Sequence, residues 1–112
     1  MIDNILIAGG GIGGLSAALA IAKSGRKVDV LERAPELTEI GAGIQLGPNA
    51  FHAFDTLGIG EHVRKIAVFV DRLRLMDAMS GEEITHISLE EAFRTRFGNP
   101  YAVVHRGELH KV

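Results

Sequence analysis

A glycine-rich turn near the start of the chain limits most strongly what this sequence can fold into. The turn occupies residues 9–14 (GGGIGG) and follows a short apolar run, residues 5–8 (ILIA), which is typical of a buried strand. Leu15 to Lys23 then show the Ala/Leu-rich pattern of a helix, and residues 28–31 (VDVL) predict a second strand. This order within about thirty residues indicates a dinucleotide-binding βαβ unit, and therefore a Rossmann-like α/β fold.

The glycines of the turn have separate physical roles in such a unit. Gly9 permits the tight passage from strand to helix, where a Cβ would clash. Gly11 allows the backbone to approach a pyrophosphate closely, and Gly14 allows the helix to pack close to the strands. The helix N-terminus offers unpaired N–H groups and a partial positive charge to the phosphates. We therefore take Gly9, Gly11, Gly13 and Gly14 as candidate cofactor-binding residues.

An acidic residue follows at the place where such a unit needs one. Glu32 lies 18 residues after Gly14, at the expected end of the second strand. Its carboxylate is suited to accept hydrogen bonds from both hydroxyls of an adenosine ribose, and it would repel the 2′-phosphate of NADP. The alternative is a glycine-rich turn followed by an unrelated surface glutamate. Strand, helix, second strand and acid are all in register, which favours the binding interpretation.

Composition narrows the remaining function classes. With 112 residues, the chain has room for at most one domain with a modest core. Twelve Lys and Arg against fourteen Asp and Glu give a net charge of −2, and no basic patch indicates a nucleic-acid partner. The chain has no cysteine, which excludes disulfides and a thiol nucleophile. The five histidines lack the spacing of a metal-binding pair, so we expect surface or junction histidines and no metal site.

The sequence shows neither the pattern of a signal peptide nor that of a membrane span. No run approaches the eighteen apolar residues of a membrane span. Asp3 stands where a signal peptide would carry positive charge, and the first apolar run is cut by the glycine turn. We therefore expect a cytoplasmic protein without a membrane span.

The rest of the chain changes from helical to mixed patterning. Glycines and a proline argue against continuous regular structure over residues 39–49. We then expect a helix from Pro48, a hairpin over residues 70–89, a short helix over 90–97, a strand over 101–104 and a helix from Arg106. The expected architecture is a Rossmann-like βαβ unit with an inserted hairpin. Only two parallel strands are secure, so we expect an incomplete domain.

Four segments together carry a resemblance to a known family. They are residues 7–14 (IAGGGIGG), 32–33 (ER), 41–49 (GAGIQLGPN) and 105–109 (HRGEL). With them, the chain resembles the N-terminal part of single-component flavoprotein monooxygenases. These are FAD-dependent aromatic hydroxylases such as salicylate hydroxylase, 3-hydroxybenzoate 6-hydroxylase and 6-hydroxynicotinate 3-monooxygenase.

The resemblance implies a role for each matching position. The glycine turn would surround the FAD pyrophosphate, Glu32 would hold the adenosine ribose, and Arg33 would lie by the adenine or ribose. Gly43 and its neighbours Ile44 and Gln45 would pass close to the flavin half of the cofactor. Some family members carry Arg where Gln45 stands, so a charged phosphate contact would be lost here or replaced by an amide.

Arg106 is the last candidate cofactor-binding residue. A guanidinium beside a diphosphate can form paired, charge-assisted hydrogen bonds. The alternative is a surface arginine at a helix start, paired with Glu108 or another acid. The resemblance favours the cofactor contact, since it implies that Arg106 reaches the phosphates or the ribitol of FAD.

The resemblance also implies the chemistry of the complete enzyme. NADH or NADPH would reduce FAD, and O2 would supply the oxygen transferred to a small aromatic acid. Residues 1–112 would be the N-terminal part of an FAD-binding domain in a larger monooxygenase and would not be catalytically complete alone; the catalytic residues are left unassigned. Two alternatives remain open: an NAD-binding Rossmann domain of a dehydrogenase, and a non-catalytic, truncated nucleotide-binding module.

Overall fold

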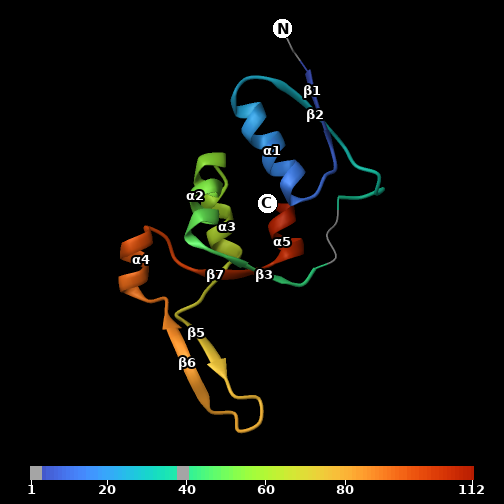
Figure 1. The fold of residues 1–112 in the computed structure, drawn as a ribbon. Helices are drawn as coiled ribbons and strands as arrows, with labels where there is room; N and C mark the ends of the chain where they lie inside the picture. The colour runs from blue at the N-terminus through green and yellow to red at the C-terminus, as the bar shows by residue number, and fades with distance from the viewer. Residues whose placement is uncertain (1–3, 38–40) are drawn as a thin grey trace.

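The computed structural model describes residues 4–37 and 41–112. These residues form five helices and seven strands, which Figure 1 shows in chain order. The elements are β1 (Asn4–Ala8), α1 (Ile12–Lys23), β2 (Lys27–Leu31), β3 (Gly43–Leu46), α2 (Pro48–Leu57), α3 (Gly60–Ile66), β4 (Val68–Phe69), β5 (Arg72–Met76), β6 (Glu83–Ser88), α4 (Glu91–Phe97), β7 (Ala102–His105) and α5 (Arg106–Lys111).

The first two strands and the helix between them form the predicted βαβ unit. β1 and β2 pair in parallel along the whole length of both strands, from Asn4 opposite Lys27 to Ala8 opposite Leu31. α1 crosses from the end of β1 to the start of β2 and packs beside both strands (Figure 1). The helix begins at Ile12, so the second half of the glycine turn forms its first turn. The predicted α/β class is therefore confirmed.

A second, antiparallel sheet holds the core of the molecule. Its strand order is β3-β7-β4, and helices α2, α3 and α5 pack around it. Apolar residues at helical spacing in α2 and on alternate positions of β7 meet between these elements. The buried core consists of Leu46, Phe51, Phe54, Val63, Ala102, Val104 and Leu109.

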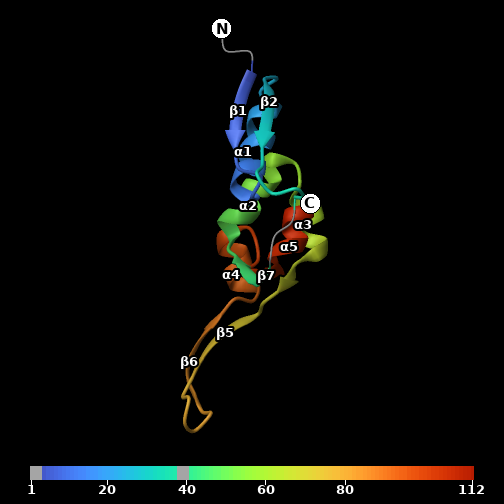
Figure 2. The ribbon, with the colours of Figure 1, turned by 90° about the vertical axis from the view of Figure 1, so that its right-hand side faces the viewer.

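The predicted hairpin is confirmed and projects away from this core. β5 and β6 pair only with each other, and Figure 2 shows them extending beyond the rest of the chain. The turn between them is held by Asp77, whose carboxylate accepts hydrogen bonds from the amides of Met79 (2.9 Å) and Ser80 (2.7 Å). The molecule measures 60 × 32 × 22 Å, and its radius of gyration is 17.6 Å. A compact domain of this length has a radius of about 13 Å, so the fold is markedly elongated.

The glycine-rich stretch contains one strand that the sequence did not predict. Residues 43–46 form strand β3, since they pair with β7. β4, a strand of two residues, adds to the other edge of β7. Within residues 4–37 and 41–112, every helix is too short or too polar to cross a membrane.

Candidate functional site

The glycine turn joins the end of β1 to the start of α1 beside the end of β2. Gly9 has φ +110°, a conformation that favours glycine, and its amide donates to the Leu31 carbonyl at 2.7 Å. The predicted clash of a Cβ at Gly9 is wrong, since a Cβ there would meet nothing within 4 Å beyond its chain neighbours; the backbone conformation is what requires glycine. Gly11 is the N-cap of α1 and has no side chain to cap the helix, whose first turn carries no acidic residue. The first-turn amides are therefore left for an external acceptor, as an anion-binding helix start requires.

The two glycines inside the first turn of α1 have opposite surroundings. A Cβ on Gly14 would lie 1.9 Å from the Gly9 carbonyl oxygen, far inside any possible contact. A Cβ on Gly13 would meet nothing within 4 Å. Gly14 is thus required for the close approach of α1 to the end of β1, as expected for this motif. Gly13 lies in open space at the same turn.

Glu32 faces the glycine turn directly. One carboxylate oxygen accepts the Gly10 amide at 2.7 Å, and the other accepts the Ala34 amide at 3.0 Å. The hydrogen bonds from Ala34 and Gly10 lower the pKa of Glu32 below its ordinary value, so the group is ionised at neutral pH. The carboxylate is exposed, and each oxygen keeps a lone pair for another donor, such as a ribose hydroxyl.

A shallow pocket of about 430 Å³ opens beside this carboxylate. It is lined by Ala8, Gly9, Leu31, Glu32 and Arg33. The predicted site residues Glu32 and Arg33 therefore share one depression with the start of the glycine turn. A second pocket, of about 470 Å³, lies along α1, but neither Gly9 nor Glu32 lines it. Phosphate and ribose groups need hydrogen-bonding partners, so we place the candidate site at the first pocket.

A second group of predicted residues lies where β3 starts and α5 begins. The Arg106 amide donates to the Ala42 carbonyl at 3.1 Å, which ties the start of α5 to the residue before Gly43. Gly43 also lies opposite His105 in the register of β3 and β7. Glu108, the alternative partner of Arg106, accepts from Lys111 at 2.9 Å. The structure thus brings Gly43 and Arg106 together although they are far apart in sequence.

The side chains of Ile44 and Gln45 lie on opposite faces of β3. The Ile44 side chain is partly buried and packs against the core. Gln45 is exposed on the other face, and its side-chain oxygen accepts a hydrogen bond from the Tyr101 hydroxyl. This bond leaves the Gln45 amide nitrogen as a donor for other groups.

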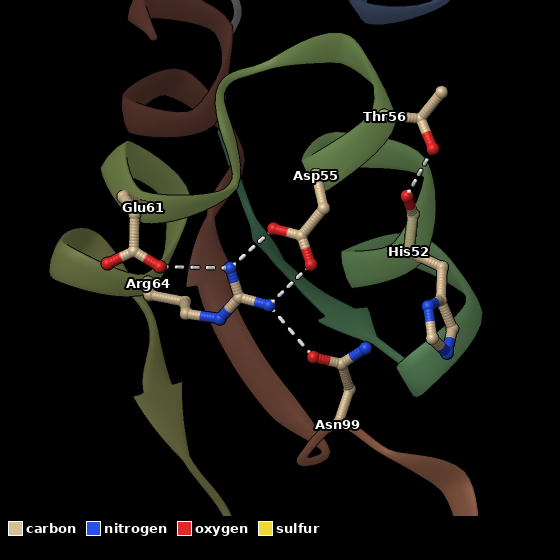
Figure 3. Close-up of polar contacts among 6 residues, drawn as sticks. All are labelled: His52, Asp55, Thr56, Glu61, Arg64 and Asn99. Carbon is tan, nitrogen blue, oxygen red and sulfur yellow. Dashed lines mark hydrogen bonds and ion pairs between the residues drawn. The ribbon is translucent and has the colours of Figure 1, made fainter.

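Arg64, Asp55 and Asn99 form a polar cluster close to the segment just before Tyr101 (Figure 3). The Arg64 guanidinium donates two hydrogen bonds to the Asp55 carboxylate, at 2.6 and 2.8 Å, and a third to the Asn99 side-chain oxygen at 2.8 Å. It also lies over the ring of Phe51, 5.3 Å from its centre. Arg64 lowers the pKa of Asp55 through these hydrogen bonds. The cluster links α2 and α3 to the segment that leads into β7.

Sequence reasoning missed two residues at the site: Gly10, within the glycine turn, and His110, which contacts it. Gly10 lies between Glu32 and the side chain of Leu37, either of which an added Cβ would meet. His110 is buried rather than on the surface, and its Nε2 lies 2.6 Å from the Gly10 carbonyl oxygen. The apolar residue Leu109 could have indicated that α5 has a buried face. It could not have indicated that His110 contacts Gly10.

Comparison with known proteins identifies the family of this chain. The family model of the NAD(P)-binding Rossmann-like domain matches residues 7–69, which include the glycine turn, Glu32 and β3. The 3-hydroxybenzoate 6-hydroxylase of Polaromonas naphthalenivorans is 62% identical over 106 residues, which cover 95% of this chain and 26% of that protein. The 6-hydroxynicotinate 3-monooxygenase of Bordetella bronchiseptica is 34% identical over 107 residues, covering 96% and 28% respectively.

A solved structure shows the same architecture. HpxO of Klebsiella pneumoniae, crystallised with FAD and uric acid, superposes with a TM-score of 0.85 at 34% identity, over 96% of this chain and 27% of that one. The chain spans about a quarter of the length of the relatives that it matches. The resemblance to flavoprotein aromatic hydroxylases is confirmed. By its match over residues 7–69, the chain belongs to the family of NAD(P)-binding Rossmann-like domains.

Proposed function

We propose that residues 1–112 are the N-terminal part of an FAD-binding domain from an NAD(P)H-dependent monooxygenase that hydroxylates a small aromatic acid. The observation that carries this proposal is the 62% identity, over 95% of the chain, to a 3-hydroxybenzoate 6-hydroxylase. Two further proteins of that name are 61% and 58% identical. The structural neighbour that holds FAD supports the choice of cofactor.

The residues present fit the adenosine and pyrophosphate part of FAD. The space that a Cβ on Gly14 would need is taken by the Gly9 carbonyl, so backbone alone can form this tight turn. We propose that Gly9, Gly11, Gly13 and Gly14 surround the pyrophosphate, with the amides at the start of α1 as donors. Glu32 then accepts the ribose hydroxyls, because its carboxylate is ionised, exposed and held by two backbone amides.

The remaining candidates serve the rest of the cofactor in this proposal. Arg33 lies in the pocket beside Glu32, where adenine or ribose would sit. Gly43, the Ile44 backbone and the Gln45 amide line the flavin side, and Arg106 reaches the phosphates or ribitol. These roles agree with the placement of Gly43 and Arg106 at one junction between β3 and α5.

The bound flavin would supply electron transfer from NADH or NADPH to O2 and the oxygen chemistry on the ring. This chain would bind and orient the cofactor, and none of its residues is assigned a catalytic role. Because the matched region is about a quarter of each relative, we expect this chain alone to bind FAD without hydroxylating a substrate. We further propose that the protein acts in the cytoplasm.

Binding of FAD to the purified protein tests this function. We expect the protein to retain FAD through gel filtration, with the absorbance spectrum of a bound flavin. Retention of NAD+ with no binding of FAD would instead support an NAD-dependent dehydrogenase domain. Absence of binding to either dinucleotide would refute the proposed function. Oxidation of NADH or NADPH with hydroxylation of an aromatic acid by this chain alone would contradict its assignment as a cofactor-binding part.

A further inference from the structure

The buried histidine of α5 makes a specific bond to the glycine turn. His110 is 8% exposed, and its Nε2 lies 2.6 Å from the Gly10 carbonyl oxygen, 100 residues earlier in the chain. A carbonyl oxygen can only accept a hydrogen bond, so Nε2 must carry the hydrogen. The ring is therefore either the neutral tautomer protonated at Nε2 or the imidazolium.

Both backbone polar groups of Gly10, its amide and its carbonyl, form hydrogen bonds. Its amide donates to Glu32 at 2.7 Å, and its carbonyl accepts from His110. The peptide bond from Gly10 to Gly11 is planar and trans, as are all peptide bonds of the described residues. The Gly11 N–H must then point to the side opposite the Gly10 carbonyl, away from His110. A hydrogen bond that fixes the direction of the Gly10 carbonyl therefore also fixes the direction of the Gly11 N–H.

We propose that His110 is a positioning residue for the pyrophosphate-binding turn. By holding the Gly10 carbonyl, it sets the peptide plane so that the Gly11 N–H is presented to the diphosphate of a bound dinucleotide. This inference rests on the proposed binding of FAD. It assigns to α5 a function beyond packing, since the helix completes the turn from the far end of the chain.

A packing role and a positioning role make different predictions for two substitutions. His110→Phe keeps a flat ring in the buried site but removes the donor, so the peptide plane loses its anchor. His110→Gln changes the shape of the side chain but supplies an amide N–H that can reach a carbonyl. If His110 only fills space, Phe is the better replacement. If it positions the turn, Gln is the better replacement.

Titration of FAD into the wild type and variants, with folding checked by circular dichroism, is the central experiment. We expect His110→Phe to bind FAD about five- to tenfold more weakly and His110→Gln to remain within about twofold of wild type, as loss and retention of one hydrogen bond predict. ADP, which keeps the diphosphate, should show the same pattern. His62→Phe, at an exposed position in α3, is the matched control and should bind like wild type.

The hydrogen bond between His110 and Gly10 can be measured in the protein without a ligand. ¹⁵N spectra of the His110 ring should show Nε2 protonated, and this measurement keeps the proposal testable if His110→Phe fails to fold. A neutral ring protonated only at Nδ1 would overturn it, as would FAD binding by His110→Phe as tight as wild type, or by His110→Gln as weak as His110→Phe. A wild type that binds no FAD would instead refute the proposed function, so the two failures are distinguishable.

Discussion

Replacing Gly14 by alanine tests the close approach on which the nucleotide-binding turn depends. The new Cβ would lie 1.9 Å from the Gly9 carbonyl oxygen, and real Cβ contacts essentially never fall under 3.0 Å. The start of α1 would therefore have to move by about 1 Å away from β1, against backbone that cannot yield as a flexible side chain does. Overpacking of this kind costs about 1–3 kcal/mol of unfolding free energy, and the displaced amides should bind FAD weakly.

Gly13→Ala is the matched control for this prediction. A Cβ there would meet nothing within 4 Å, and alanine is favoured over glycine within a helix by about 0.5–1 kcal/mol. Urea denaturation followed by circular dichroism should therefore show Gly14→Ala destabilised and Gly13→Ala unchanged or more stable. Equal stability of Gly14→Ala and wild type, or equal damage from both substitutions, would refute the packing argument.

Four further predictions concern three side chains, Glu32, Arg64 and Tyr101. Glu32→Ala should weaken FAD binding at least about tenfold through loss of charge-assisted hydrogen bonds, measured by fluorescence titration. Because backbone amides lower the folded pKa of Glu32, its stabilising contribution is complete above the pKa of the unfolded chain and is lost as the pH falls through the lower folded value. In Glu32→Gln, the unfolding free energy should therefore fall less than in wild type as the pH is lowered into the acid range. An equal fall in both proteins would contradict this. Arg64→Lys should lose the paired bonds to Asp55 and lower the unfolding free energy by about 1 kcal/mol, since the pair is partly exposed. Tyr101→Phe should change the unfolding free energy by less than about 1 kcal/mol, because Gln45 can bond to water instead, and a larger loss in urea denaturation would show a structural role for the pair.

The local parts of the fold could be predicted from the sequence because their causes are local. The short apolar run before the glycine turn and the Ala/Leu-rich run after it predict β1 and α1 from adjacent residues. Pro48 begins α2 as expected, since its missing N–H costs nothing in the first turn of a helix. The hairpin over β5 and β6 was evident from alternation on either side of a Ser-Gly turn.

The parts that were missed depend on partners distant in sequence. Residues 43–46 lie within a stretch, 39–49, that is rich in glycine, and they form a strand because β7 supplies hydrogen-bonding partners about sixty residues later. The inward direction of Ile44 follows from that pairing, so the sequence could place the segment near a ligand but not choose its exposed face. The bond from His110 to Gly10 spans the chain and has no local signal at either end.

The central claim is that the glycine turn and Glu32 bind the adenosine diphosphate half of FAD. The most direct test is titration of FAD into ¹⁵N-labelled protein with the amide signals assigned. The account predicts the largest shifts at Gly11, Gly13, Gly14 and Glu32, with further shifts at Gly43 and Arg106. Binding of FAD that leaves the signals of residues 9–14 and Glu32 unmoved would contradict the account.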